Sequence, residues 1–225
     1  GKESEFDAQG TFEATEIIVS AEATGRILCF DVEEGSTVEA GNIVGAIDSI
    51  QLHLQRRQLI AQQSALLSSR PDVKKQVASI REEIAKQKSE LARVENMLRD
   101  GAATQKQYDD IGAHIRILEG KLEAALSTLD KNTSSINGNS VAIEAQIAAL
   151  DDRIAKCRIN SPVSGTLLVK YAQSGELASP GKPLMKVANL DEIFLRAYFT
   201  SEQLADITLG DTVTVIADFG GDERY

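Results

Sequence analysis

The sequence feature that most constrains this chain is a heptad repeat of apolar residues between about residues 49 and 157. In the first part of this stretch, one row of residues recurs at every seventh position: Val77, Ile84, Leu91 and Leu98. A second row has one polar member, Gln87, and otherwise comprises Leu52, Leu59, Leu66, Val73, Ile80 and Val94. Alternating steps of three and four residues place both rows on one helix face, which must be buried.

The later part of the stretch repeats in the same way, at Tyr108, Ile115, Leu122, Leu129, Ile136, Ile143, Leu150 and Cys157. Between the two parts, Gly101 can take the left-handed conformation that ends a helix. Thr104 with Gln107 three residues later is typical of a capping box, which starts a helix. The sequence therefore predicts an antiparallel α-hairpin over residues 49–157 with its tip at 99–104. Arms of roughly 50 residues would each be about 75 Å long.

We expect the hairpin to be interrupted partway along both arms. Pro71 removes a helical hydrogen-bond donor from the first arm. Counted back equally from the turn, it lies opposite residues 131–133, where the second arm enters a stretch of poor helix formers, 132–140. These two features predict a kink or break at both places, with faster hydrogen exchange there than in residues 80–98 and 108–128.

The segments on either side of this stretch repeat each other. Glycines stand at positions 25, 35 and 41 and again, at the same spacing, at 165, 175 and 181. Apolar residues lie in phase with them, for example Ile27 with Leu167 and Val38 with Ala178. Such a pattern indicates an internal repeat. Each copy is too small to bury a core alone, so residues 19–48 and 158–188 are expected to form one small two-sheet β domain.

The remaining residues form a separate β segment. The run Thr11 to Ser20 predicts a strand that begins in the N-terminal segment, 1–18. Residues 189–225 contain an expected strand at 193–199, a short helix that begins with cap residues at Thr200, and an alternating strand from Gly210 to Asp218. Two strands and a helical turn do not close a domain, so we expect the N-terminal strand to join them.

Composition excludes some classes of partner. The formal net charge of −10 argues against nucleic acid or anionic lipid. There is no run of 18 apolar residues to cross a membrane. Gly1 does not look like a natural start, so we expect a targeting or anchoring segment to be missing from the sequence.

The two cysteines, Cys29 in a strand pattern and Cys157 on the helix seam, are expected to be buried structural thiols. A disulfide between them is compatible with the sequence, but the sequence does not assign it.

Two glycine-patterned halves around an α-hairpin, followed by a β segment with one short helix, resemble the hemolysin-D-type family of periplasmic adaptor, or membrane fusion, proteins. The resemblance covers nearly the whole chain from residue 9. It implies an elongated, multidomain α+β fold. In that fold a coiled-coil hairpin is inserted between two halves of a biotinyl/lipoyl-like domain, and residues 189–225 begin a β-barrel domain.

The resemblance also implies a function and partners. Members of the family link an inner-membrane transporter, of the ABC or RND type, to an outer-membrane channel of the TolC-like tunnel type for efflux or secretion. Several copies assemble in a ring, which we expect to be hexameric. The implied location is the periplasm, with attachment to the inner membrane through a segment absent from this sequence.

A second motif lies near the predicted tip. The family's channel-docking signature has Arg, then Leu four residues on, then Ser seven further. Arg93, Met97 and Thr104 hold this spacing, and the two substitutions keep an apolar side chain and a hydroxyl. Arg93 and Met97 each precede a seam residue and are i,i+4 neighbours on an adjacent face. We therefore expect Arg93, Met97 and Thr104 to bind the channel.

No catalytic, cofactor-binding or metal-binding pattern is present in the sequence. His53 and His114 lie on separate arms, and no zinc or copper spacing exists. No phosphate loop or nucleophile elbow occurs, so the chain is expected not to be an enzyme. Two alternative hypotheses remain: a lipoyl or biotinyl carrier with a coiled-coil insertion, and a purely structural coiled-coil protein. The absence of a lysine at the turn near Asp48 argues against the carrier hypothesis.

Overall fold

The computed structural model describes residues 8–216, which divide into two compact units. One unit is the helical segment Asp48–Arg158, and the other is built from residues on both sides of it. Within residues 8–216, no helix combines the length and the hydropathy that a membrane span requires. The mixed helix-and-sheet fold expected from the sequence is confirmed.

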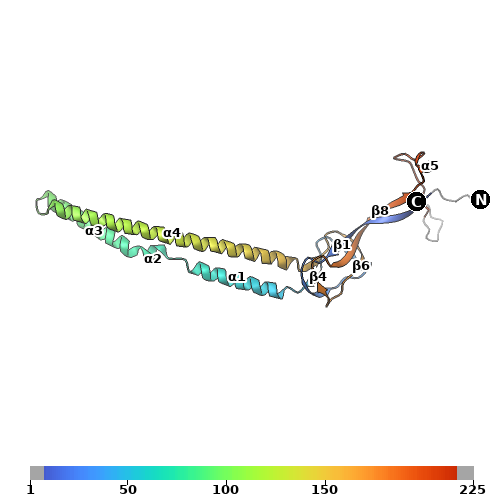
Figure 1. The fold of residues 1–225 in the computed structure, drawn as a ribbon, viewed down its shortest axis with the longest axis horizontal. Helices are drawn as coiled ribbons and strands as arrows, with labels where there is room; N and C mark the ends of the chain where they lie inside the picture. The colour runs from blue at the N-terminus through green and yellow to red at the C-terminus, as the bar shows by residue number, and fades with distance from the viewer. Residues whose placement is uncertain (1–7, 217–225) are drawn as a thin grey trace, which may run out of the picture. The chain divides into compact units, whose positions relative to one another are not determined.

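The helical unit is an antiparallel hairpin (Figure 1). Its first arm consists of α1 (Ile50–Ser68), α2 (Val73–Gln76) and α3 (Ala78–Arg99), and its second arm is the single helix α4 (Gln105–Ala155). Ion pairs bridge the arms at Arg56–Asp151, 2.5 Å, and Lys88–Glu119, 2.8 Å. These pairs are 32 residues apart on each arm, from 56 to 88 and from 119 to 151. The two arms therefore keep one register along this length.

The heptad rows line the seam between the arms, which buries some of their residues and half-buries the others. In the first arm, Val77 is fully buried, and Ile84 and Val94 are nearly so. The buried apolar residues of α4 are Ile115, Leu118, Leu129 and Leu150. In α1 the heptad leucines are only half-buried.

The predicted interruption of the first arm is confirmed. Helix α1 ends at Ser68, and the chain resumes helical structure at Val73, after Pro71. Both ends are capped: the hydroxyls of Ser68 and Ser69 donate to the carbonyls of Ala65 and Leu66. The Asp72 carboxylate accepts the N–H of Lys75 at 3.1 Å. The joint therefore satisfies many of the polar groups that a broken helix exposes.

The predicted interruption of the second arm is wrong, because α4 runs unbroken through 132–140. Each poor helix former there costs less than about 1 kcal/mol relative to alanine, and tertiary contacts override such small preferences. The Gln63 side chain donates to the carbonyl and hydroxyl oxygens of Ser140, both at 3.2 Å. Arg70 donates to the Asn137 side chain at 2.6 Å. Polar residues of the first arm thus bind the segment that was expected to break.

The β unit contains, within the described residues, two four-stranded sheets. The first has the order β1-β8-β6-β3, with strands Gln9–Ser20, Pro183–Tyr198, Gly165–Lys170 and Thr37–Val38. The second has the order β5-β4-β2-β7, with strands Arg158–Asn160, Ile43–Ile47, Gly25–Phe30 and Leu177–Ala178. Each sheet takes strands from both glycine-patterned segments. Fully buried side chains from both, including Ile27, Phe30, Leu167 and Val187, form the core.

The two glycine-patterned segments exchange reciprocal hydrogen bonds. The N–H of Gly35 donates to the carbonyl of Leu167 at 2.8 Å, and the equivalent N–H of Gly175 donates to the carbonyl of Ile27 at 2.7 Å. Both glycines have positive φ, +86° and +92°, a conformation that other residues rarely adopt. The sequence repeat therefore corresponds to two structural copies that complete each other.

Strand β8 continues past the glycine-patterned segment and pairs with β1 throughout. The register shifts between Ala14 and Thr15, where β8 carries additional residues between Asn189 and Ile193. The short helix expected after Thr200 is confirmed as α5 (Ser201–Leu204), with a capping box from Thr200 and Gln203.

Two expectations for the β unit are wrong. The strand expected from Gly210 is not formed over residues 210–215, and Ile216 makes only an isolated bridge; its last two residues lie outside the described range. Alternation shows which face could be buried, but a strand also needs a partner. Cys29 is exposed rather than buried, because an irregularity in the β2–β4 pairing between Ile27 and Cys29 turns it outward.

Candidate docking site at the hairpin tip

The tip is a tightly hydrogen-bonded turn between α3 and α4. Gly101 has φ of +76°. Its N–H donates to the carbonyl of Leu98 at 3.1 Å, while the N–H of Ala102 donates to the carbonyl of Met97 at 2.7 Å. These two bonds are the Schellman pattern of helix termination. The predicted left-handed glycine is confirmed, and the turn fixes where the last residues of α3 lie.

Thr104 starts the second arm as the sequence predicts. Its hydroxyl oxygen accepts the N–H of Gln107 at 3.2 Å, and its own N–H donates to the Gln107 side chain at 2.9 Å. This reciprocal capping box satisfies two groups at the start of α4. Thr104 is exposed, so its role in the chain alone is to cap the helix.

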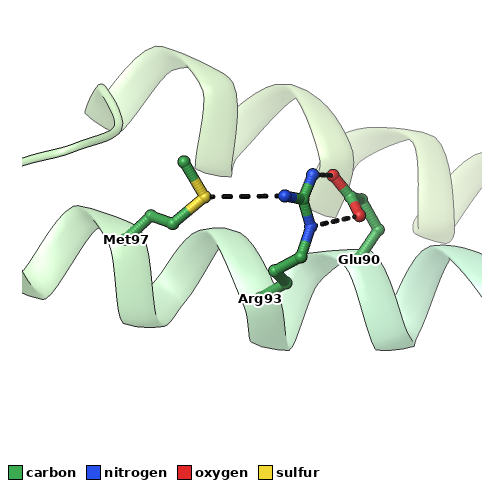
Figure 2. Close-up of polar contacts among 3 residues, drawn as sticks. All are labelled: Glu90, Arg93 and Met97. Atoms are coloured by element: carbon green, nitrogen blue, oxygen red, sulfur yellow. Dashed lines mark hydrogen bonds and ion pairs between the residues drawn. The ribbon is translucent and has the colours of Figure 1, made fainter.

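Arg93 and Met97 lie together on α3, as Figure 2 shows. The Arg93 side chain is 64% exposed, and its Nη1 donates to the Met97 sulfur at 3.8 Å. The adjacent residue Val94 is buried in the seam. Arg93 is therefore displayed off the seam, as its position predicted, whereas Met97 beside it is half-buried.

The structure adds a residue that the sequence reasoning missed. Glu90 accepts two hydrogen bonds from Arg93: Nε donates to Oε2 at 2.9 Å and Nη2 donates to Oε1 at 2.5 Å (Figure 2). The bond and the positive charge of Arg93 lower the pKa of Glu90, and the same bond to Glu90 raises the pKa of Arg93. The i,i+3 spacing of Glu90 and Arg93 on one helix was the available signal.

A second ion pair lies on the other arm near the tip. Lys106 donates to the Asp110 carboxylate at 2.6 Å, and this bond raises the pKa of Lys106. Both residues are exposed. This pair resembles Glu90–Arg93 in charge and exposure but does not include a residue of the docking motif.

A shallow hollow of about 360 Å³ lies between the arms close to the tip. It is lined by Leu91, Tyr108, Asp109, Gly112, Ile115 and Arg116. None of the three predicted docking residues lines it. Within residues 8–216 no group of three or more His, Cys, Asp or Glu side chains is arranged to hold a metal ion.

Comparison with proteins of known sequence places these features in context. The chain is 24% identical over 218 residues to a probable multidrug resistance protein, EmrK, of Escherichia coli K12; the match covers 91% of this chain and 56% of the relative. It is 30% identical over 112 residues to the multidrug export protein EmrA of the same organism, covering 47% of this chain and 29% of the relative. The chain thus spans little more than half of the first relative. No protein-family model matches it.

Comparison with solved structures gives the same picture for the fold. The periplasmic adaptor protein EmrA matches over 97% of this chain and 86% of its own, with a TM-score of 0.52 and 13% identity. MacA from Actinobacillus actinomycetemcomitans matches over 92% and 60%, with a TM-score of 0.54 and 16% identity. The resemblance to the periplasmic adaptors is confirmed. At these identities the structural likeness concerns the fold alone.

Proposed function

We propose that this chain is part of a periplasmic adaptor subunit that links an inner-membrane transporter to an outer-membrane channel for efflux or secretion. The observation that carries the proposal is the insertion of a long α-hairpin between two mutually hydrogen-bonded β halves. The relatives named as multidrug export and periplasmic adaptor proteins support it. The role is architectural: the hairpin provides a long helical segment with a docking tip, and the β unit is the folded domain into whose sequence the hairpin is inserted.

The finer domain assignment belongs to the same proposal. Residues 19–48 and 158–188 are the two halves of a lipoyl-like domain, and residues 1–18 and 189–225 belong to a β-barrel domain. In β8, the register shift lies between Asn189 and Ile193, which is at this proposed boundary. The partners would be a tunnel-type channel at the tip, a transporter of the ABC or RND type, and further copies of the chain in a ring.

The docking residues of this proposal are Arg93, Met97 and Thr104. Arg93 offers a planar set of donors that can bond several oxygens at once, and Met97 offers an adaptable apolar surface. A hydrogen bond to a charged group contributes about 1.5–3 kcal/mol, and a ring of copies would multiply its effect. Thr104 supports the site by fixing the start of α4.

Substitution of the tip tests the proposal. Arg93→Ala should leave thermal unfolding nearly unchanged, because the side chain lies outside the seam, while export and crosslinking to the channel fall sharply. Arg93→Lys should restore them only in part, since lysine lacks the planar fork. Full export by a triple variant with alanine at positions 93, 97 and 104 would show that the tip does not dock.

The carrier and the structural coiled-coil alternatives have their own tests. A lipoyl or biotinyl carrier would show a covalent lysine adduct by mass spectrometry, and an adaptor would not. A protein that assembles through its helices alone would lose its fold when residues 49–157 are deleted. An adaptor should keep a folded β unit, since the hydrogen bonds between its two halves do not involve the hairpin.

A further inference from the structure

The Glu90–Arg93 pair determines which hydrogen-bond donors the tip can offer. A guanidinium group has five N–H groups. Among the described residues, Glu90 and Met97 engage three of them: one on Nε, one on Nη2 and one on Nη1. One N–H on each Nη nitrogen is left to face a partner, and the charge of Arg93 is already balanced by the Glu90 carboxylate.

We propose that Glu90 is a positioning residue for docking, and that the Glu90–Arg93 pair binds uncharged carbonyl oxygens of the partner rather than carboxylates. This inference rests on the proposed function and names the partner's chemistry at the same site. The occupant is a protein surface that presents backbone carbonyls, as the last turn of a helix does.

The preference follows from the charge of the partner group. A carbonyl oxygen adds to the two remaining N–H groups, and both bonds to Glu90 persist. A carboxylate could reach the same two N–H groups, but the charge of Arg93 is already balanced by the Glu90 carboxylate. It would lie beside Glu90, and the repulsion between the two like charges would oppose its binding.

Docking also removes water from the tip, and this favours the paired state. Covering an unpaired guanidinium would be costly, because a buried charge needs a partner. Arg93 enters the interface with its counter-charge already bound on the same helix. The pair is exposed in the chain alone, so it adds little to folding stability, and its effect should appear in docking.

The test is the substitution Glu90→Gln in the full chain, with Asp110→Asn as its matched control. Both changes remove one negative charge from an exposed ion pair near the tip, but only the first involves Arg93. Affinity is measured for the purified outer-membrane channel of the same organism across a series of salt concentrations. We expect Glu90→Gln to weaken binding about tenfold and to make it more salt-dependent. Asp110→Asn should stay within about twofold of the unmodified chain.

A second readout concerns Arg93 itself. Side-chain ¹⁵N relaxation should show an ordered Arg93 Nε in the unmodified chain and in Asp110→Asn, and a mobile one in Glu90→Gln. Equal or tighter binding by Glu90→Gln, or no change in Arg93 order, would overturn the role of Glu90 while leaving the docking tip intact. If Arg93→Ala also bound normally, or the unmodified chain did not bind at all, the proposed function would fall together with this inference.

Discussion

The two arms of the hairpin carry the same kind of heptad repeat but differ in continuity. The first arm is divided into α1, α2 and α3, whereas α4 extends over 51 residues without a break. Pro71 stands at the break, and a run rich in asparagine, serine and glycine, 132–140, stands within the unbroken helix. Both stretches are unfavourable for helix formation, yet only one of them ends a helix.

The difference lies in the kind of cost that each residue imposes. Proline has no N–H, and its ring clashes with the preceding turn, so no neighbour can restore the missing bond. Asparagine, serine and threonine keep their backbone donors and cost only tenths of a kcal/mol each. Thr133 donates its hydroxyl to the carbonyl of Leu129 at 2.9 Å, and the Gln63 and Arg70 side chains bind the same segment. Small costs can be offset by contacts, and a missing donor cannot.

Hydrogen exchange should show the largest difference between the arms. Opening free energies in a folded protein range from near zero to the global stability. We expect the amides of residues 72–74, in the first turn after the joint, to exchange orders of magnitude faster than those of 131–140. Equally slow exchange at both places would mean that the first arm is effectively continuous. Equally fast exchange would mean that α4 opens opposite the joint.

Introduction of a proline into the second arm should have the next largest effect. Asn137→Pro should destabilise the hairpin by about 3 kcal/mol or more, because it removes a donor from a continuous helix. Asn137→Ala is the control, since it removes the contact with Arg70 but keeps the N–H. Pro71→Ala should change stability by about 1 kcal/mol or less, because the capped joint already has its bend. Urea denaturation followed by circular dichroism measures all three, and similar losses for the two alanine variants and Asn137→Pro would contradict the argument.

Removal of the polar contact across the seam should have an intermediate effect. Ser140 is 8% exposed and is a buried polar residue of α4. Gln63→Ala should cost about 1–3 kcal/mol, because the Ser140 hydroxyl loses its partner from the first arm. Arg70→Ala, at an exposed contact, should stay within about 0.5 kcal/mol. If the two variants had equal stability, the Gln63–Ser140 bond would not be what supports 132–140.

A glycine in the low-propensity run offers a change of opposite sign. A methyl group at Gly138 would meet no heavy atom within 4 Å, and its backbone is helical. Gly138→Ala should therefore stabilise the chain by about 0.5–1 kcal/mol. Gly101→Ala, at φ of +76° in the tip turn, should destabilise it, since alanine is strained there. Thermal unfolding of both variants checks the pair of signs, and a loss of stability in Gly138→Ala would contradict the prediction.

The smallest expected effect is acid loss of the Glu90–Arg93 pair. The bond to Arg93 lowers the pKa of Glu90 in the folded chain. The pair's contribution is therefore present above the ordinary glutamate range of about pH 4 and is lost as the pH falls through the lowered pKa. The thermal midpoint of Glu90→Gln should lie slightly below that of the unmodified chain at pH 7 and converge with it in acid. A difference that grows as the pH falls would contradict this sign.

Much of the fold could be predicted from the sequence because it follows from residue spacing and from conformations that only certain residues adopt or exclude. The heptad spacing gave the hairpin, Gly101 and Thr104 with Gln107 gave its turn, and Pro71 gave the joint. The matched glycines gave the two β halves, since Gly35 and Gly175 need a conformation that other residues rarely adopt. For the candidate site, the i,i+4 spacing alone predicted that Arg93 and Met97 lie together near the turn.

Only the tertiary structure decided the features that depend on a partner elsewhere in the chain. The side-chain contacts that support α4 through 132–140 come from Gln63 and Arg70, which lie 77 and 67 residues away from the groups they bind. The exposure of Cys29 depends on how β2 pairs with β4. A sequence records donors and spacings, while the choice among competing contacts of similar energy is made by the packed structure.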